Sequence, residues 1–196
     1  MLMLLWSTAP MHAADDLITR QISISVEEPG ALCNLVTNEQ AKKITNIKLT
    51  GKLNVEDLKF IRQMAGCYTG KWENGSYTKY DGVLQHLDIS EAQFVGTGTF
   101  SVYYKSSGRK ADFSSYAIGE YTFAYLDNLK SIMLPSCATS IGKSAFCRCS
   151  GLASLALPNS LTSIGNNAFS GCSGLTSLML PNSLTSIGDR VFFRCI

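Results

Sequence analysis

A 23-residue repeat is the feature that most constrains how this chain of 196 residues can fold. The sequence LPNSLTSIG occurs at residues 157–165 and again, 23 residues later, at 180–188. The same spacing relates four isoleucines and four phenylalanines: Ile118, Ile141, Ile164 and Ile187, and Phe123, Phe146, Phe169 and Phe192. Self-similarity at one fixed period predicts a stack of structural repeats.

The first half of each repeat has the pattern of a short strand. Leu152, Leu155 and Leu157 read L-x-x-L-x-L, and the last two alternate as side chains do along a strand. Pro158 follows, and proline ends a ladder because it has no N–H. The next repeat has the same pattern at Leu175, Leu178 and Leu180. A short strand is therefore expected in every repeat.

The second half of each repeat has the pattern of a turn. Gly165 is expected to make a tight turn, and Ala168, Phe169 and Cys172 fit the inner side of a short helical turn. A single unit cannot bury its apolar edge, but stacked units can. We expect an α/β fold: a right-handed solenoid with a parallel sheet on the concave face and short helices or turns on the convex face.

The part of the chain before the regular repeats follows the same scheme more loosely. We expect irregular repeats with insertions at 44–117 and regular repeats at 118–196, in an array that continues beyond Ile196. Within the irregular part, Asn54 and Asp57 predict a capping box at the start of a helix. Residues 14–43 are expected to form a cap of one strand and one short helix. That strand should place Ile22, Ile24 and Val26 alternately, and that helix should use Leu32, Leu35 and Val36.

The first residues resemble the end of an export signal. An apolar block leads through small residues to Ala13, so we predict an incomplete signal peptide at 1–13 and a secreted or surface location. The alternative is an apolar tail that belongs to the fold. No later stretch approaches the roughly 20 apolar residues of a membrane span.

Charge and cysteine content limit the functions open to the chain. Lys and Arg total 17 against 15 Asp and Glu, which argues against a nucleic-acid partner because such proteins carry a basic face. The chain has seven cysteines, an odd number, and Cys149, Cys172 and Cys195 recur at one repeat position. This recurrence favours buried thiols over disulfide bridges.

The sequence contains no motif that would support catalysis. His12 lies in the predicted signal peptide, so a triad in the mature protein would have to use His86, which no family motif surrounds. A metal or redox role for Cys147 and Cys149 is disfavoured because no second ligand pair appears. We predict no enzyme, no metal and no cofactor.

The repeats resemble the BspA-like family of bacterial leucine-rich repeats. Residues 134–149, 157–172 and 180–195 are similar to its pattern LxxLxLPxxLTxIGxxAFxxC, with Ala138 and Val191 as apolar departures. Residues 44–65 and 87–90 look like the leading region of exported members. The resemblance implies a surface or secreted protein active in adhesion and host contact. It does not identify a ligand, because a fold alone never does.

Two surfaces are candidate binding sites. The first comprises outward-facing strand positions, which suit an adaptable protein contact because they combine small side chains with methionine. These residues are Lys130, Ser131, Met133, Ser154, Ala156, Thr176, Ser177 and Met179. The alternative is a solvated face that binds nothing.

The second candidate surface is aromatic. Asn74 and Gly75 predict a two-residue hairpin turn that brings Trp72 opposite Tyr77. Tyr80, Tyr103 and Tyr104 complete this set, which could bind a sugar face. The alternative is a lid that packs these rings on the array.

From these features we predict a binding or adhesion protein of the bacterial cell surface or secretome. Its partner would be a host or bacterial surface protein or glycan. The alternative is a structural spacer within a larger surface protein.

Overall fold

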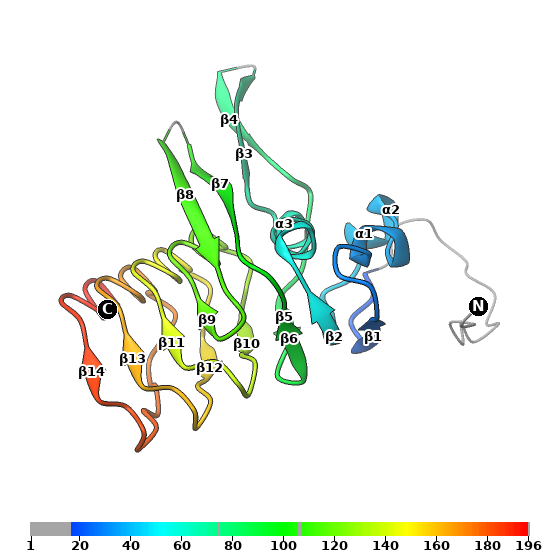
Figure 1. Ribbon diagram of the computed structural model, residues 1–196. Helices are drawn as coiled ribbons and strands as arrows, with labels where there is room; N and C mark the ends of the chain where they lie inside the picture. The colour runs from blue at the N-terminus through cyan, green and yellow to red at the C-terminus, as the bar shows by residue number, and fades with distance from the viewer. Residues whose placement is uncertain (1–16, 74, 106, 196) are drawn as a thin grey trace.

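The computed structural model describes residues 17–73, 75–105 and 107–195, which form stacked coils with parallel sheets and few helices (Figure 1). The predicted signal peptide and residues 14–16 of the predicted cap lie outside these residues. In the described part the helices are α1 (Leu32–Leu35), α2 (Asn38–Ala41) and α3 (Val55–Met64). None of them is long and apolar enough to cross a membrane.

A parallel sheet, here called the long parallel sheet, runs through most of the molecule. Its strands are β1 (Ile22–Val26), β2 (Asn46–Leu53), β5 (His86–Asp88), β10 (Ser131–Met133) and β12 (Ser154–Ala156), in that order, and β6 (Ala92–Phe94) also pairs with β2. Ile47, Leu87, Ile132 and Leu155 lie in register and are buried. The predicted strand pattern of leucines and isoleucines is therefore confirmed for these coils.

A second parallel sheet, the short-strand sheet, lies on another side of the coils. Its strands are β9 (Ala117–Ile118), β11 (Ser140–Ile141), β13 (Ser163–Ile164) and β14 (Ser186–Ile187). The four repeated isoleucines are aligned in its register. Thr162 and Thr185 add side-chain hydrogen bonds of 3.0 Å to the carbonyl of the threonine one coil earlier. These threonine side chains therefore form hydrogen bonds between neighbouring coils.

The third side of each coil consists of turns and not of helices, so the second of the two predicted forms, short helices or turns, is present. Ala168, Phe169 and Cys172 lie on its inner side, as predicted, and are buried. The N–H groups of Phe123, Phe146 and Phe169 donate to carbonyls of the next coil at 2.8–3.0 Å. A helix would use these N–H groups internally, so it could not link the coils in this way. Gly165 begins a tight turn, as predicted, because its carbonyl accepts from the N–H of Ala168. It makes room for a neighbouring coil, since an added Cβ would lie 2.8 Å from the backbone nitrogen of Lys143.

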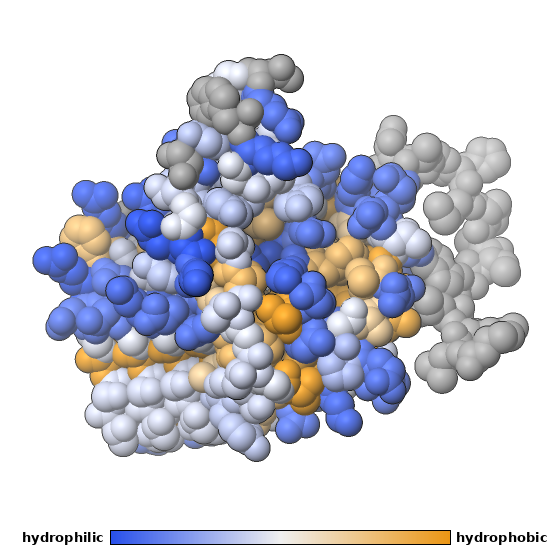
Figure 2. Space-filling model, turned by 45° about the horizontal axis from the view of Figure 1, so that its top comes forward, coloured by the Kyte–Doolittle hydropathy of each residue, from blue (hydrophilic) through white to orange (hydrophobic). Residues whose placement is uncertain are grey.

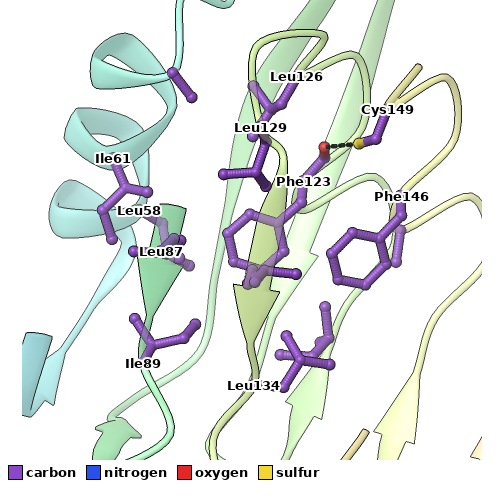
Figure 3. Packing of buried hydrophobic residues seen from close by; sticks show 14 of the residues in the cluster. Leu58, Ile61, Leu87, Ile89, Phe123, Leu126, Leu129, Leu134, Phe146 and Cys149 are labelled. Carbon is purple, nitrogen blue, oxygen red and sulfur yellow. Dashed lines mark hydrogen bonds between the residues drawn. The ribbon is translucent and has the colours of Figure 1, made fainter. Parts of the chain in front are cut away.

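The core between the three sides contains the aligned phenylalanines and cysteines. Phe123, Phe146, Phe169 and Phe192 stack with ring centroids 5.4–5.7 Å apart. The Cys149 thiol donates to the carbonyl of Phe123 at 3.0 Å (Figure 3). Cys172 and Cys195 repeat this contact one and two coils later. The buried position predicted for these thiols is confirmed for Cys149 and Cys172, whereas Cys195 is half-buried.

The N-terminal part has the predicted strand and the predicted capping box. The Asn54 side chain accepts from the N–H of Asp57, and the Asp57 carboxylate accepts from the N–H of Asn54. Asp57 also accepts from the N–H groups of Gly30 and Leu32, which ties α1 to α3. One expectation is wrong: Leu35 is exposed, because α1 has a single turn and buries only Leu32.

Arg62 connects α3 to the first regular coil. Its guanidinium is buried and donates to the carbonyls of Thr122 at 2.8 Å and Ala124 at 3.0 Å. In the next coil the equivalent carbonyls, those of Ala145 and Cys147, accept from N–H groups of the coil before. Arg62 therefore supplies the donors that an earlier coil would have provided.

The two insertions form an antiparallel sheet with the order β4-β3-β7-β8, which projects from the coil stack in Figure 1. Its strands are β3 (Tyr68–Glu73), β4 (Ser76–Lys79), β7 (Gly98–Tyr104) and β8 (Ser107–Phe113). Trp72 pairs with Tyr77 across the first hairpin, as predicted.

The last described coil departs from the expected pattern. The strand predicted from Leu175, Leu178 and Leu180 does not form, and Leu180 is exposed. On the other side of the same coil, β14 pairs with β13. The coil is therefore attached through the short-strand sheet and the turns, while its remaining side carries no ladder to β12.

Candidate binding surfaces

The outward face of the long parallel sheet carries two rows of aligned side chains. One row contains Asn46, His86, Ser131 and Ser154, and the other contains Lys48, Asp88, Met133 and Ala156. These residues alternate with the buried ones, so the pleat directs them away from the core. This set of eight residues is called the strand face below.

One end of the strand face is charged. The Lys48 ammonium forms an ion pair with Glu91. This hydrogen bond and the nearby carboxylates of Glu91 and Asp88 raise the pKa of Lys48, against the smaller lowering effect of desolvation. Asp88 accepts hydrogen bonds from the N–H and the hydroxyl of Ser90, at 2.9 and 2.6 Å. These charges therefore have partners within the protein.

The other end of the strand face is weakly polar and exposed. Met133 is 45 % exposed, and Ser154 and Ala156 are exposed beside it. No charged residue stands in register on β10 or β12 beyond Asp88 of β5. This end can therefore contact a partner without first removing water from a charge.

Four of the eight predicted strand residues, Ser131, Met133, Ser154 and Ala156, lie together on this face. Lys130 is exposed just before β10, where its carbonyl accepts from the N–H groups of Ala153 and Ser154. The structure does not bring the remaining three, Thr176, Ser177 and Met179, onto the sheet; they are exposed, and Met179 is 90 % exposed.

Strands β2 and β5 contribute residues to the strand face that were not predicted as part of a binding surface. These residues are Asn46, Lys48, His86 and Asp88. The alternation of polar and apolar residues at 46–50 and 86–88 was the signal that could have identified them.

His86 forms a hydrogen bond across two strands, between its Nδ1 and the Ser131 hydroxyl at 2.8 Å. Asp88, the nearest acid in sequence, is engaged with Ser90. This arrangement links β5 to β10. Among residues 17–195 that the structure describes, no three His, Cys, Asp or Glu side chains are grouped as metal ligands would be.

The second candidate surface lies where the antiparallel sheet meets the turns. Tyr104 packs edge-on against Tyr68, with centroids 5.4 Å apart, and stacks on Tyr125 at 4.8 Å. Arg148 covers the same ring at 5.0 Å and donates to its hydroxyl at 3.2 Å. Tyr104 therefore packs on the array, as the lid alternative predicts. Tyr103 packs inside its own sheet, against Gly70.

An open hollow of about 560 Å³ lies between the two hairpins. It is lined by Tyr68, Gly75, Ser76, Tyr77, Lys79 and Lys105. The Lys79 ammonium lies 2.9 Å from Asp127 and 4.5 Å from the centre of the Tyr68 ring. Burial acts to lower the pKa of Lys79, but the hydrogen bond and the charge of Asp127 outweigh it, so the pKa is raised. Lys79 is therefore a fixed positive charge.

Tyr80 and Trp72 are the remaining two predicted aromatics. Tyr80 is exposed just beyond the end of β4. The backbone of Trp72 is part of β3, but its side chain is not among the described ones. Figure 2 shows hydrophilic side chains, in blue, gathered around the hairpins, and paler ones over the coil stack at lower left.

Comparison with known proteins gives one family match and two solved structures that are similar over part of this chain. A model of the BspA type leucine rich repeat region matches residues 89–196 in six copies. A leucine-rich repeat protein of T. pallidum is 36 % identical over 38 % of this chain and 34 % of its own, with a TM-score of 0.37. One from Bacteroides ovatus is 35 % identical over 48 % of this chain and 24 % of its own, with a TM-score of 0.40. The chain therefore spans about a third or less of these proteins, and no curated protein matches it.

Proposed function

Because this chain belongs to the BspA-type leucine-rich repeat family, we propose that it binds another protein through the strand face. Repeat arrays hold side chains in register on a rigid frame, which suits extended protein contacts. The partner would be a host or bacterial surface protein; a surface glycan is the other partner class that the sequence left open. The chain would act in adhesion, as a secreted or surface protein exported by the signal peptide predicted at 1–13.

The geometry proposed for this role is a right-handed solenoid with the long parallel sheet on its concave face. A concave face lets several strands contact one partner at the same time. The single observation that carries the proposal is the exposed, uncharged end of the strand face, formed by Met133, Ser154 and Ala156. At this end an adaptable methionine side chain lies beside small residues, and the charged residues lie at the other end of the face. Protein interfaces have a similar arrangement, with an apolar centre and a polar rim.

A binding panel of purified extracellular-matrix proteins and a glycan array tests this proposal. We expect a matrix protein to bind the chain and the double variant Met133→Glu/Ala156→Glu to weaken that binding at least tenfold. Asn159→Glu is the matched control, because Asn159 is exposed and lies outside the strand face. Equal binding by the chain and the double variant would refute the assignment.

The alternative function is that of a structural spacer. The observation that favours it is the use of Thr139, Thr162 and Thr185 side chains for bonds between coils, not for an outer partner. A spacer would bind nothing on the panel, and the double variant would leave the adhesion of a larger assembly unchanged.

The proposal contains no catalytic step. A hydrolytic role for the His86–Ser131 pair would be revealed by turnover of an ester substrate that is lost in His86→Ala while thermal unfolding stays unchanged. We expect no such turnover, because the described contact of Asp88 is with Ser90.

A further inference from the structure

We propose that the hollow between the two hairpins binds an acidic saccharide, one or two sugar rings bearing a carboxylate or a sulfate. This site lies on the antiparallel sheet, away from the strand face, and does not depend on the protein partner proposed above. The case rests on the size of the hollow, its charge and its aromatic lining.

The size of the hollow fits a small ligand. Its volume of about 560 Å³ lies within the range of roughly 300–1,000 Å³ that is common for ligand pockets. Both hairpins contribute to the lining: Gly75 to Lys79 belong to the first, and Lys105 lies at the turn of the second. A ligand seated here would contact two insertions that are far apart in the sequence.

Positive charge collects around the hollow although the whole chain has a net charge of only +2. Lys79 and Lys105 line it, and Arg148 lies over the neighbouring Tyr104 ring. Arg109 and Arg148 both lie close enough to Tyr125 for their charges to oppose the rise in its pKa, which burial causes. Two cations therefore line the hollow itself, and the two arginines lie near the tyrosines beside it.

These cations have few acidic partners. Asp127 forms an ion pair with Lys79 and accepts a hydrogen bond from Ser150. In the described part of the chain, no carboxylate lies within 4.0 Å of the charged nitrogens of Lys105, Arg109 or Arg148. An anionic group entering the hollow would therefore meet positive charge that is not already neutralised.

The aromatic lining favours a sugar as the carrier of that anion. Tyr68 and Tyr77 line the hollow and are both half-buried. The Lys79 ammonium already lies over the Tyr68 ring, so the apolar face of a sugar would pack against the part of these two side chains that remains exposed. Asp127 and the Tyr68 ring hold the Lys79 ammonium in place, so little side-chain freedom remains to be lost on binding. A long nucleic acid would need a basic stripe, whereas this cationic area is local.

Calorimetric titration with four probes tests the proposal: a hyaluronan tetrasaccharide, a chondroitin 4-sulfate tetrasaccharide, neutral N-acetylchitotetraose and a dT10 oligonucleotide. We expect at least one acidic sugar to bind tenfold or more tightly than both the neutral sugar and the oligonucleotide. The two acidic sugars distinguish a carboxylate from a sulfate requirement. Binding should weaken between 50 and 500 mM salt, because salt screens the exposed Lys105.

Lys105→Asn is the decisive variant. Lys105 has φ +51°, a left-handed conformation that Asn tolerates well, so the turn should be kept while the charge is lost. We expect about a fivefold or greater loss of affinity for the acidic sugar. Lys52→Asn, which removes an exposed lysine of β2 outside the hollow, should leave the affinity unchanged.

Tyr77→Leu provides a second variant, which should also weaken binding by removing a ring. Thermal unfolding of each variant reports whether it remains folded. Equal affinity for acidic and neutral sugars, equal or tighter binding of dT10, no binding of either acidic sugar at millimolar concentration, or no effect of Lys105→Asn would each overturn the proposal. The strand-face variant Met133→Glu should bind the saccharide normally, so the two proposals can fail separately.

Discussion

Two positions in each regular coil hold a residue in the left-handed region of the backbone map. One position is occupied by Tyr121, Ser144, Asn167 and Arg190, and the other by Tyr125, Arg148, Gly171 and Arg194, all with φ between 53° and 77°. Glycine and asparagine adopt this region most easily. Only the coil with Asn167 and Gly171 has a favourable residue at both positions. The sequence therefore did not reveal that every coil repeats this backbone geometry.

Arg190→Asn should therefore stabilise the protein. Arg190 is exposed and stands where the preceding coil has Asn167. We expect the free energy of unfolding to rise by about 0.5–1 kcal/mol, because asparagine is less strained at positive φ. Urea unfolding measures the change, and the reverse substitution Asn167→Arg should lower stability by a similar amount. A fall in stability with Arg190→Asn would contradict this explanation.

Buried thiols should make stability depend on alkaline pH. The neighbouring Cys149 thiol and burial raise the pKa of Cys172 above the ordinary thiol value of 9.0. The unfolded chain therefore loses this proton at a lower pH than the folded chain, and the stabilising contribution is present below pH 9 and lost above it. We expect Cys172 to contribute a loss of about 1.4 kcal/mol per pH unit above pH 9.

Urea unfolding at pH 8, 9 and 10 measures this dependence. Cys172→Ala should be less stable at pH 8 but should show a shallower decline, since one titrating group is absent. An identical decline in the variant and the parent chain would mean that Cys172 does not contribute to it.

At the scale of elements, the sequence predicted those features whose signals are local. The capping box of Asn54 and Asp57 and the pairing of Trp72 with Tyr77 are confirmed because each depends on residues a few positions apart. The role of Arg62 could not be predicted in this way. It depends on carbonyls about 60 residues away that have no earlier coil to bond them.

Arg62→Met tests whether Arg62 replaces the hydrogen-bond donors of an earlier coil. The variant would leave the carbonyls of Thr122 and Ala124 buried without donors, and each such group costs about 1–3 kcal/mol. We therefore expect a loss of about 3 kcal/mol or more in urea unfolding. Lys59→Met on the same helix removes only an exposed ion pair with Glu56, so it should cost less than about 1 kcal/mol. Equal effects of the two substitutions would rule out the role given to Arg62.

At the scale of the whole molecule, the repeat predicted the stack of coils correctly and the binding surface only in part. Half of the predicted strand residues lie on the strand face, because identical repeats indicate which positions align. The contribution of β2 and β5 was missed because their repeats are irregular. The hollow between the hairpins depends on the pairing of β3 with β7, two insertions whose contact no local pattern encodes.

A core substitution should lower the stability of the stack most when it lies in a coil that has a neighbouring coil on both sides. Phe146 lies between Phe123 and Phe169 and is fully buried, whereas Phe192 contacts Phe169 and is 41 % exposed. We expect Phe146→Ala to cost about 3–5 kcal/mol and Phe192→Ala about 1–2 kcal/mol, measured by urea unfolding. Similar costs at both positions would show that the core is not a nearest-neighbour stack.

The central claim, that the strand face binds a protein, is tested most directly by hydrogen–deuterium exchange on the complex with the matrix protein that binds most tightly in the panel. The account predicts slower exchange at residues 130–133 and 153–156 in the complex than in the free chain. Protection confined to the short-strand sheet or to the turns, with these residues exchanging at the same rate in both states, would contradict it.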